Sequence, residues 1–466
     1  MRKVTISNCP KSIFEEQKEV PVELSSSVYI ERVNELIALM NEKLIDFLII
    51  YGDREHFANI EYFTKYDCRF EEALFILSND GKKYIVVGNE GQSYSKVVPY
   101  DIVVLRYNHF SLQGQPRLGI QKLRELFLLI GVNTKSKIGL TGYKYFEGNE
   151  VDDADHCFDV PEYIVKELYK VVNKDQVYNL TKNLTGLPRG IRMTVRTTEE
   201  IALIDYQATK VANVMRRLIK SLAVGISETE LSKKSMDDFS PNPMSPMVNF
   251  GAGSVSMGLK SPRPFVTLSM GDVMGLCYAQ RGSLCCRVGL AATDESSILP
   301  ELRTTIEDFY KVYWTAIATW YETIKVGCTG GELFSKIHSL IGGADFGLGL
   351  NPGHYIATDE WVNSSIYKDS TIKIHSGSHI QCDMIVSREN PVVSAICEDT
   401  VIIADEKLRQ SLKKDYPEVF KKILIRQKFM REVLKINISD DVLPMSELNG
   451  VMLPFMLNNK LLFAYE

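Results

Sequence analysis

One short segment occurs twice in this 466-residue chain, as VGISETEL at 224–231 and as VGCTGGEL at 326–333. In each copy a Ser or Thr stands three residues before a Glu, which is the form of a capping box that opens a helix. Each copy follows a long helical stretch and precedes a strand hairpin, at 272–279 with 283–292 and at 378–386 with 392–403. The repeated order predicts a pseudo-twofold domain of helices and strands, and two such halves usually leave a cleft between them.

A domain boundary is predicted just before this repeat. Thr197 and Glu200 form a capping box, and apolar residues then recur every three or four positions from Ile201 to Leu222, as in one buried helical stripe. Before the boundary, short apolar runs alternate with helical stretches, which is typical of an α/β domain. The sequence therefore predicts an N-terminal domain over 1–190, a second domain over 191–435 and a C-terminal extension over 436–466.

The strands of the N-terminal domain are expected within five short apolar segments, at 46–52, 73–77, 83–88, 101–105 and 137–140. The C-terminal extension carries an apolar run of its own, VMLPFML at 451–457. That much exposed apolar surface would be unusual in a monomer, so this run is expected to pack on the main domain or on a second subunit.

Composition excludes several classes of function. The net charge is −5, and no block of consecutive Lys or Arg offers a surface for nucleic acid or an anionic membrane. No segment has the length of a membrane span or the form of a signal peptide, so a cytoplasmic protein is expected. The nine cysteines are too few and too irregularly spaced for a disulfide scaffold, so reduced thiols are expected.

Several short motifs, in their order and spacing, resemble those of one enzyme family. They are Gly271-Asp272 at the first hairpin, Gly353-His354 and Ser376-Gly377 before the second, and Glu398-Asp399-Thr400 on its last strand. In this respect the chain is similar to the pita-bread family of creatinase, Xaa-Pro aminopeptidase, prolidase and methionine aminopeptidase. The resemblance implies a creatinase-type α/β domain followed by a pita-bread domain, and a homodimer.

The peptidases of this family bind two divalent metal ions through two Asp, one His and two Glu. Carried over by resemblance, these ligand positions fall on Cys277, Cys286, His354, Asp383 and Glu398. Two carboxylates have thus become thiols. The remaining two anions are too few for two dications, so no metal cofactor is expected. A second histidine of the family is also replaced, by Trp361.

Three hypotheses follow for the activity. The first is a metal-free hydrolase of a C–N bond in a small amino-acid or guanidino compound, as in creatinase, with Lys260 at the position of the creatinase proton shuttle and His354, Asp383 and Glu398 as the other catalytic residues. The second is a metal-dependent Xaa-Pro peptidase with an atypical site, in which Cys277 and Cys286 join the other ligands around Zn or Mn. The third is a non-catalytic protein whose cleft binds a small molecule, a peptide end or another protein.

Other residues near these positions are candidates for substrate binding. Asp359 and Glu360 precede Trp361, and an aromatic ring beside two acids can receive a cationic group, although such a trio is more often the edge of a loop or helix. Asp383 stands in an apolar strand, where a carboxylate must be paired, liganded or exposed at a cleft. In Glu398-Asp399, strand alternation is expected to bury only one of the two acids.

Overall fold

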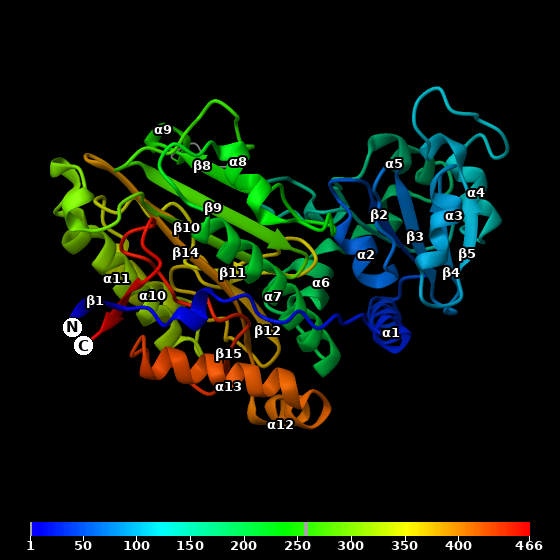
Figure 1. Ribbon diagram of the computed structural model, residues 1–466. Coiled ribbons are helices and arrows are strands. Elements are labelled where there is room, and N and C mark those ends of the chain that lie inside the picture. Colours follow the sequence, from blue (N-terminus) through cyan, green and yellow to red (C-terminus); the bar gives the residue numbers. More distant parts are fainter. Residues whose placement is uncertain (1, 256–259) are drawn as a thin grey trace. The chain divides into compact units, whose positions relative to one another are not determined.

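The computed structural model describes residues 2–255 and 260–466, and the chain forms two compact units (Figure 1). The N-terminal unit comprises Leu24–Arg192, and the C-terminal unit comprises Met193–Glu466 together with the first 23 residues. The domain boundary thus lies at 192/193, close to the predicted position. Assigning 1–23 to the N-terminal domain was wrong, because β1 (Val4–Asn8) pairs with β16 (Leu461–Tyr465) in an antiparallel ribbon.

The N-terminal unit is built on a six-stranded mixed sheet in the order β5-β4-β3-β2-β6-β7. These strands are β2 (Phe47–Gly52), β3 (Ala73–Ser78), β4 (Lys83–Val87), β5 (Val103–Arg106), β6 (Ile138–Thr141) and β7 (Val177–Asn179). Its main helices are α1 (Ser26–Lys43), α2 (Ala58–Thr64), α4 (Leu123–Leu129), α5 (Glu162–Leu168) and α6 (Thr181–Thr185), with the short α3 (Gly91–Tyr94). All five predicted segments overlap a strand.

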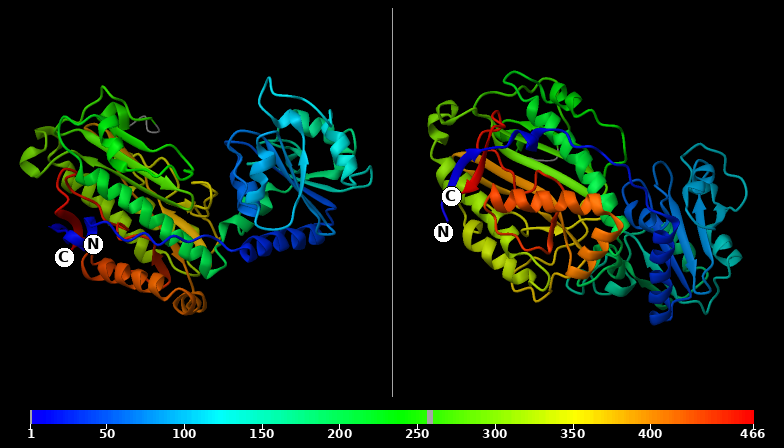
Figure 2. Two further views of the ribbon diagram at one scale, coloured as in Figure 1. Left: turned by 45° about the vertical axis from the view of Figure 1, so that its right-hand side comes forward. Right: turned by 60° about the horizontal axis from the view of Figure 1, so that its bottom comes forward.

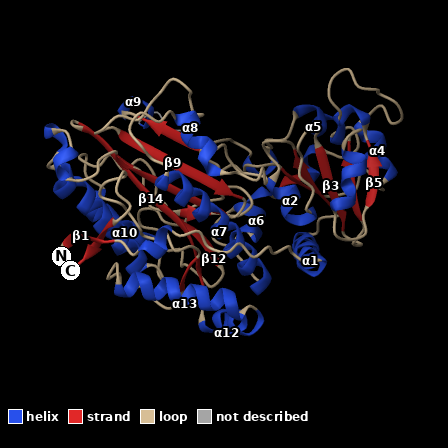
Figure 3. Cartoon of the chain, viewed as in Figure 1, coloured by secondary structure: helices blue, strands red, loops and turns tan. Residues whose placement is uncertain are grey.

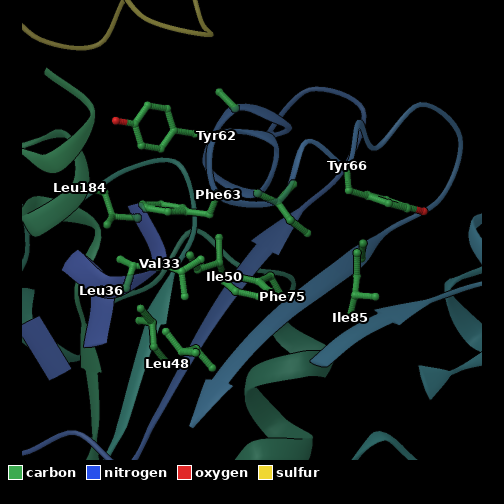
Figure 4. Close-up of a cluster of buried hydrophobic side chains, with 14 of the residues drawn as sticks. Val33, Leu36, Leu48, Ile50, Tyr62, Phe63, Tyr66, Phe75, Ile85 and Leu184 are labelled. Carbon is green, nitrogen blue, oxygen red and sulfur yellow. The ribbon is translucent and has the colours of Figure 1, made fainter. Parts of the chain in front are cut away.

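Both faces of this sheet are buried, because alternate side chains of a strand point to opposite sides. In β2, Leu48 and Ile50 join one hydrophobic cluster, which Figure 4 shows together with Val33, Leu36 and Phe63 from the helices. The neighbouring residues of β2 join a second cluster on the opposite face. The apolar runs therefore reflect burial on both sides.

The C-terminal unit contains an eight-stranded sheet whose main path is β11-β12-β14-β10-β9-β8 (Figure 3). The strands are β8 (Met247–Phe250), β9 (Val273–Gln280), β10 (Ser283–Leu290), β11 (His354–Tyr355), β12 (Ser378–Cys382) and β14 (Val392–Ile403), with β13 (Val386–Glu389) and β15 (Val442–Pro444) also paired to β14. The first predicted hairpin is confirmed. The second is interrupted, because β12 ends at Cys382 and β13 begins at Val386, which leaves Asp383 between them.

The helices of this unit follow the predicted repeat. They are α7 (Thr198–Lys220), α8 (Glu228–Ser232), the short α9 (Ala252–Val255), α10 (Lys311–Thr323), α11 (Gly330–Ile341), α12 (Glu406–Asp415) and α13 (Pro417–Glu432). Capping boxes open α7 and α8, and the Thr329 hydroxyl accepts a hydrogen bond from the Glu332 amide at the start of α11. Each half thus runs long helix, capped helix and strand hairpin, so the repeat in sequence is a repeat in structure.

The last 31 residues are part of the C-terminal unit and not a separate extension. The apolar run 451–457 is almost entirely buried, and the amides of Met456 and Leu457 donate to the carbonyls of Leu290 and Ala292 beside the sheet. The two ends of the chain meet in the β1–β16 ribbon (Figure 2). None of the helices in the described ranges has the length and hydrophobicity needed to cross a membrane.

Candidate functional site

Strand register brings four of the five candidate ligand positions into one row. Cys277 on β9 lies directly opposite Cys286 on β10, and Cys286 lies directly opposite Glu398 on β14. Directly paired residues share a face of the sheet. Cys382 pairs with Asp399, so the antiparallel register continues to place Asp383 beside Glu398. The row therefore runs across β9, β10, β14 and the end of β12.

The fifth position, His354, is held against this row by the backbone of β11. Its strand partner is Gln381, two residues before Asp383. Gly353 has φ of +117°, and a Cβ at this position would lie 2.7 Å from the Gln381 carbonyl oxygen. Only glycine fits this close approach at positive φ. The Gly-His motif is therefore a packing requirement that sets the direction from which the imidazole enters the site.

The His354 imidazole lies among three carboxylates. Its Nε2 is 3.2 Å from Glu360 Oε1, 3.5 Å from Glu398 Oε1 and 3.7 Å from Asp383 Oδ2. The ring stacks on the Trp361 indole, with 4.0 Å between centroids and 17° between planes. Its other nitrogen, Nδ1, donates to the Tyr355 carbonyl at 3.2 Å. We refer to His354, Glu360, Asp383 and Glu398 as the His354 cluster.

The charges of this cluster depend strongly on one another. Burial by itself lowers the pKa of His354. The short contacts with Glu360 and Glu398, together with the negative charges of Glu360 and Asp383, have a larger opposite effect and raise this pKa to about 10. Burial raises the pKa of Asp383 to about 6, although His354 opposes the rise. Burial and the Asp383 carboxylate raise the pKa of Glu398 well above its usual range. The imidazole is therefore a cation at neutral pH. Its charge partly offsets the unfavourable effect of burial on the ionised forms of the neighbouring acids.

Some polar atoms of the His354 cluster make no hydrogen bond. Nε2 of His354 is within ion-pair distance of all three acids, yet within the described residues it has no partner with hydrogen-bond geometry, and neither has the buried Oδ1 of Asp383. Charge attraction, and not a saturated hydrogen-bond network, holds these groups together.

The Cys277 thiol remains neutral. Cys277 is fully buried, and its interaction with the Cys286 thiol together with burial raises its pKa well above the ordinary value. A thiol binds a metal ion as thiolate, so a high pKa opposes metal binding. The group of ligand atoms that lie within 4.8 Å of one another contains His354, Glu360 and Glu398 and neither thiol.

The opposite face of β10 and β14 carries a buried ion pair. Arg287 donates through one guanidinium nitrogen to both oxygens of Asp399, at 2.8 and 2.9 Å, and both side chains are almost completely buried. Glu398 and Asp399 are thus both buried, so the expectation that only one would be was wrong. Each face of this sheet is covered, and each acid has its own cationic neighbour.

These residues do not fit a centre of two metal ions. Two of the five positions hold thiols, one of them with a strongly raised pKa, and Asp399 is already neutralised by Arg287. The residues are better suited to a single metal ion than to two, because an imidazole nitrogen and two carboxylate oxygens lie within 4.8 Å of one another. If bound there, one such ion would act as a Lewis acid.

The other candidate residues divide into two groups. Glu360 and Trp361 contact His354, as described, and both are partly accessible. Asp359 is largely buried and is not in the group of close ligand atoms. Lys260 accepts a hydrogen bond at its carbonyl from Asn249, and in the described ranges no hydrogen bond or ion pair joins its side chain to the His354 cluster. The proposed shuttle role of Lys260 thus gains no support from contacts.

One residue that contacts the His354 cluster was missed in the sequence. Gln381 donates through Nε2 to Glu398 Oε1 at 3.2 Å and to the Leu284 carbonyl, and so fixes one acid of the cluster. The signal available was its place on the same strand face as Asp383, two residues away. His379 on the same strand is also buried, and burial lowers its pKa to about 3, so it is neutral.

Comparisons with known proteins agree with this architecture. Residues 32–142 match the family model of the Creatinase/Prolidase N-terminal domain. No curated protein matches the chain in sequence. Among solved structures, the Xaa-Pro dipeptidase from Bacillus anthracis has a TM-score of 0.60 at 13% identity, over 81% of this chain and 96% of that one.

Two further structures give nearly the same result. The prolidase from Pyrococcus horikoshii OT3 has a TM-score of 0.61 at 15% identity, and the X-Pro aminopeptidase from Thermotoga maritima MSB8 has 0.60 at 14%. Each match covers 80% of this chain and 95% of the other. At such identities the likeness establishes fold and not activity. The chain therefore has the pita-bread fold of prolidases and X-Pro aminopeptidases, with a creatinase/prolidase N-terminal domain over residues 32–142.

Proposed function

We propose that the pita-bread domain recognises a small amino or guanidino compound at the His354 cluster and does so without a pair of metal ions. The observation that carries this proposal is the gathering of three carboxyl groups around a single imidazole, each with an oxygen within 3.7 Å of His354 Nε2. A cationic group of a ligand would relieve the repulsion among these acids. Glu360, with 26% of its side chain exposed, is the acid most open to such a group.

The ring of Trp361 supports the same class of ligand. It stacks on His354 and is itself only partly buried, so it lies at the accessible edge of the cluster beside Glu360. Indole rings attract cations through their faces, where the ring quadrupole is negative. A carboxylate next to an indole is a suitable receptor for an ammonium or guanidinium group.

A second candidate function is hydrolysis of a C–N bond in the bound compound. One observation favours it: Asp383, with a pKa of about 6, lies 3.7 Å from a protonated imidazole. A carboxylate with a pKa near neutrality can accept a proton from the attacking water. An adjacent imidazolium can stabilise the negative charge that develops on an oxygen or nitrogen atom bonded to the attacked carbon. Product formation separates this function from binding alone.

Binding is tested with glycinamide, whose ammonium group is the expected determinant, against neutral acetamide. We expect glycinamide to raise the unfolding temperature of the full chain and acetamide to leave it unchanged. Replacing Glu360 by Gln should weaken glycinamide binding about tenfold, the effect of one lost charge-assisted contact. Glu332→Gln, in an exposed pair with Lys336 on α11, is the matched control and should bind normally. Equal stabilisation by acetamide would contradict the proposal.

Metal dependence is tested on the same protein. We expect the glycinamide effect to survive exhaustive chelation, with elemental mass spectrometry showing less than one metal ion per chain. One Zn or Mn per chain, lost in Glu360→Gln and required for glycinamide binding, would instead support the single-cation site at His354, Glu360 and Glu398. Two ions per chain would overturn the assignment of the ligand positions.

A further inference from the structure

A cavity of about 650 Å³ lies within the N-terminal unit, beside β7 and α6. Part of its lining is apolar and comes from Ile45, Leu180 and Leu187, whereas the charged part is mainly basic. Sites for small molecules typically have volumes of about 300–1,000 Å³. The cavity is therefore large enough for a small organic molecule, and its charged lining indicates which kind.

Four cationic side chains line this cavity, and they come from separate segments of the chain. They belong to Lys43 at the end of α1, Lys137 directly before β6, Lys182 in α6 and Arg189 after α6. The one acid among the lining residues that the structure describes is Asp155. No run of basic residues in the sequence marks this position, because only the fold brings the four cations to one cavity.

The acids on this side of the unit act on Lys182. Its Nζ pairs with the Glu147 carboxylate at 2.9 Å. A hydrogen bond to Glu147 raises the pKa of Lys182, and the negative charge of Asp155 adds a smaller contribution in the same direction. The positive charge of Lys182 is therefore already balanced by its neighbours.

The other three cations of the cavity have no acidic partner. In the part of the chain that the structure describes, the side chains of Lys43, Lys137 and Arg189 form neither a hydrogen bond nor an ion pair. The nearby Asp46 carboxylate does not line the cavity, and it accepts from the backbone amide of Lys137 at 2.8 Å and from Asn79 Nδ2 at 3.2 Å. A cavity lined by charges of one sign concentrates ions of the opposite sign. The lining therefore favours an anionic ligand.

Two neutral side chains add hydrogen-bond donors to the same lining. The Tyr178 hydroxyl and the Asn183 amide make no hydrogen bond to any other described residue. A phosphate monoester carries a charge of about −1.5 to −2 at pH 7 and offers three acceptor oxygens. Guanidinium groups bind phosphate through paired hydrogen bonds, and lysines bind it as point charges. Such an ester matches three free cations and two neutral donors better than a carboxylate does.

We propose that this cavity binds the phosphate monoester of a small organic molecule. The phosphate lies at Lys43, Lys137 and Arg189, and the organic part lies against the apolar lining. The site belongs to the N-terminal unit alone, and the inference does not depend on the function proposed for the His354 cluster. It assigns to this unit a binding role in addition to any structural one.

Isothermal titration of the full chain with phenyl phosphate, in a phosphate-free buffer of low ionic strength, tests this proposal. Benzyl alcohol is the neutral control and phenylacetate is a carboxylate of similar size. We expect phenyl phosphate to bind at least tenfold more tightly than phenylacetate, and benzyl alcohol not to bind. Inorganic phosphate lacks the apolar part and should bind more weakly than phenyl phosphate. Added NaCl should weaken the binding of phenyl phosphate, because it screens exposed charges.

Substitutions at exposed residues locate the binding site without disturbing the fold. Lys137→Gln and Arg189→Gln should each weaken the binding of phenyl phosphate about tenfold, the effect of one lost charge-assisted contact. Lys135→Gln is the matched control, because Lys135 is also exposed, lies two residues from Lys137 and does not line the cavity. Binding should be unchanged in Lys135→Gln and in Glu360→Gln.

Four results would each overturn the proposal. They are binding of benzyl alcohol as tight as that of phenyl phosphate, tighter binding of phenylacetate, an equal loss in Lys135→Gln, and full affinity in both Lys137→Gln and Arg189→Gln. An equal loss in Lys135→Gln would show that phenyl phosphate responds only to the net charge of the protein. A loss in Glu360→Gln would place the ligand at the His354 cluster instead.

Discussion

Replacing Arg287 by Met is expected to destabilise the protein by about 3–5 kcal/mol, because it leaves the Asp399 carboxylate buried without its cation. Both side chains are almost completely buried, and the guanidinium also donates to the carbonyls of Glu398, Leu448 and Val451. The change would therefore strand one charge and four carbonyl groups, since the guanidinium also donates to the Cys286 carbonyl. Chemical denaturation of the full chain, followed by circular dichroism, measures the loss.

Two further variants show that the effect comes from the buried charge. Arg388→Met breaks an ion pair with Asp308, whose side chain is 50% exposed, and should cost less than about 1 kcal/mol. Adding Asp399→Asn to Arg287→Met removes the stranded charge and should restore part of the lost stability. If Arg287→Met cost no more than Arg388→Met, the pair would contribute little to the fold.

This ion pair also bears on function. Because Asp399 is committed to Arg287 on one face of β14, only Glu398 of the two adjacent acids reaches the row of candidate ligand positions. Cys277 and Cys286 complete that row. The row therefore holds two carboxyl groups, those of Asp383 and Glu398, with His354 beside them.

Much of the fold could be predicted from local patterns. Period-3.6 apolar spacing and the capping box at Thr197 located α7, and the repeated capping motif located α8 and α11. These signals reside within a few consecutive residues. The first 23 residues carried no such signal, since β1 is defined only by pairing with β16 at the far end of the chain.

Only some residues of the candidate site could be predicted, because the site too depends on contacts between segments far apart in the sequence. Cys277 lies opposite Cys286 because the β9–β10 hairpin fixes their register. Glu398 joins them through the pairing of β10 with β14, two strands far apart in the sequence. The approach of Glu360 and Trp361 to His354 depends on a loop, whose path no periodicity specifies. Gln381 was overlooked because an amide on a buried strand has no chemical signature until its partner is known.

The largest pH dependence of stability is expected from His354. Its pKa is about 10 in the folded protein, against 6.5 for an unperturbed histidine. A raised pKa means that the folded state binds the proton more tightly, so this stabilisation is fully present below pH 6.5 and is lost as the pH rises toward 10. Between pH 6.5 and 9 the loss should approach about 3 kcal/mol. His354→Gln should lack this decline.

His379 provides a control of opposite sign on the neighbouring strand. Burial lowers its pKa to about 3, so its contribution is present above pH 6.5 and is lost as the pH falls from 6.5 toward 3. His379→Gln should therefore remove part of the acid sensitivity and leave the decline above pH 6.5 intact. Denaturant unfolding of both variants and the parent protein from pH 4 to 9 measures the two effects separately. If His354→Gln kept the alkaline decline, the imidazole would not be the cation that holds Glu360, Asp383 and Glu398 together.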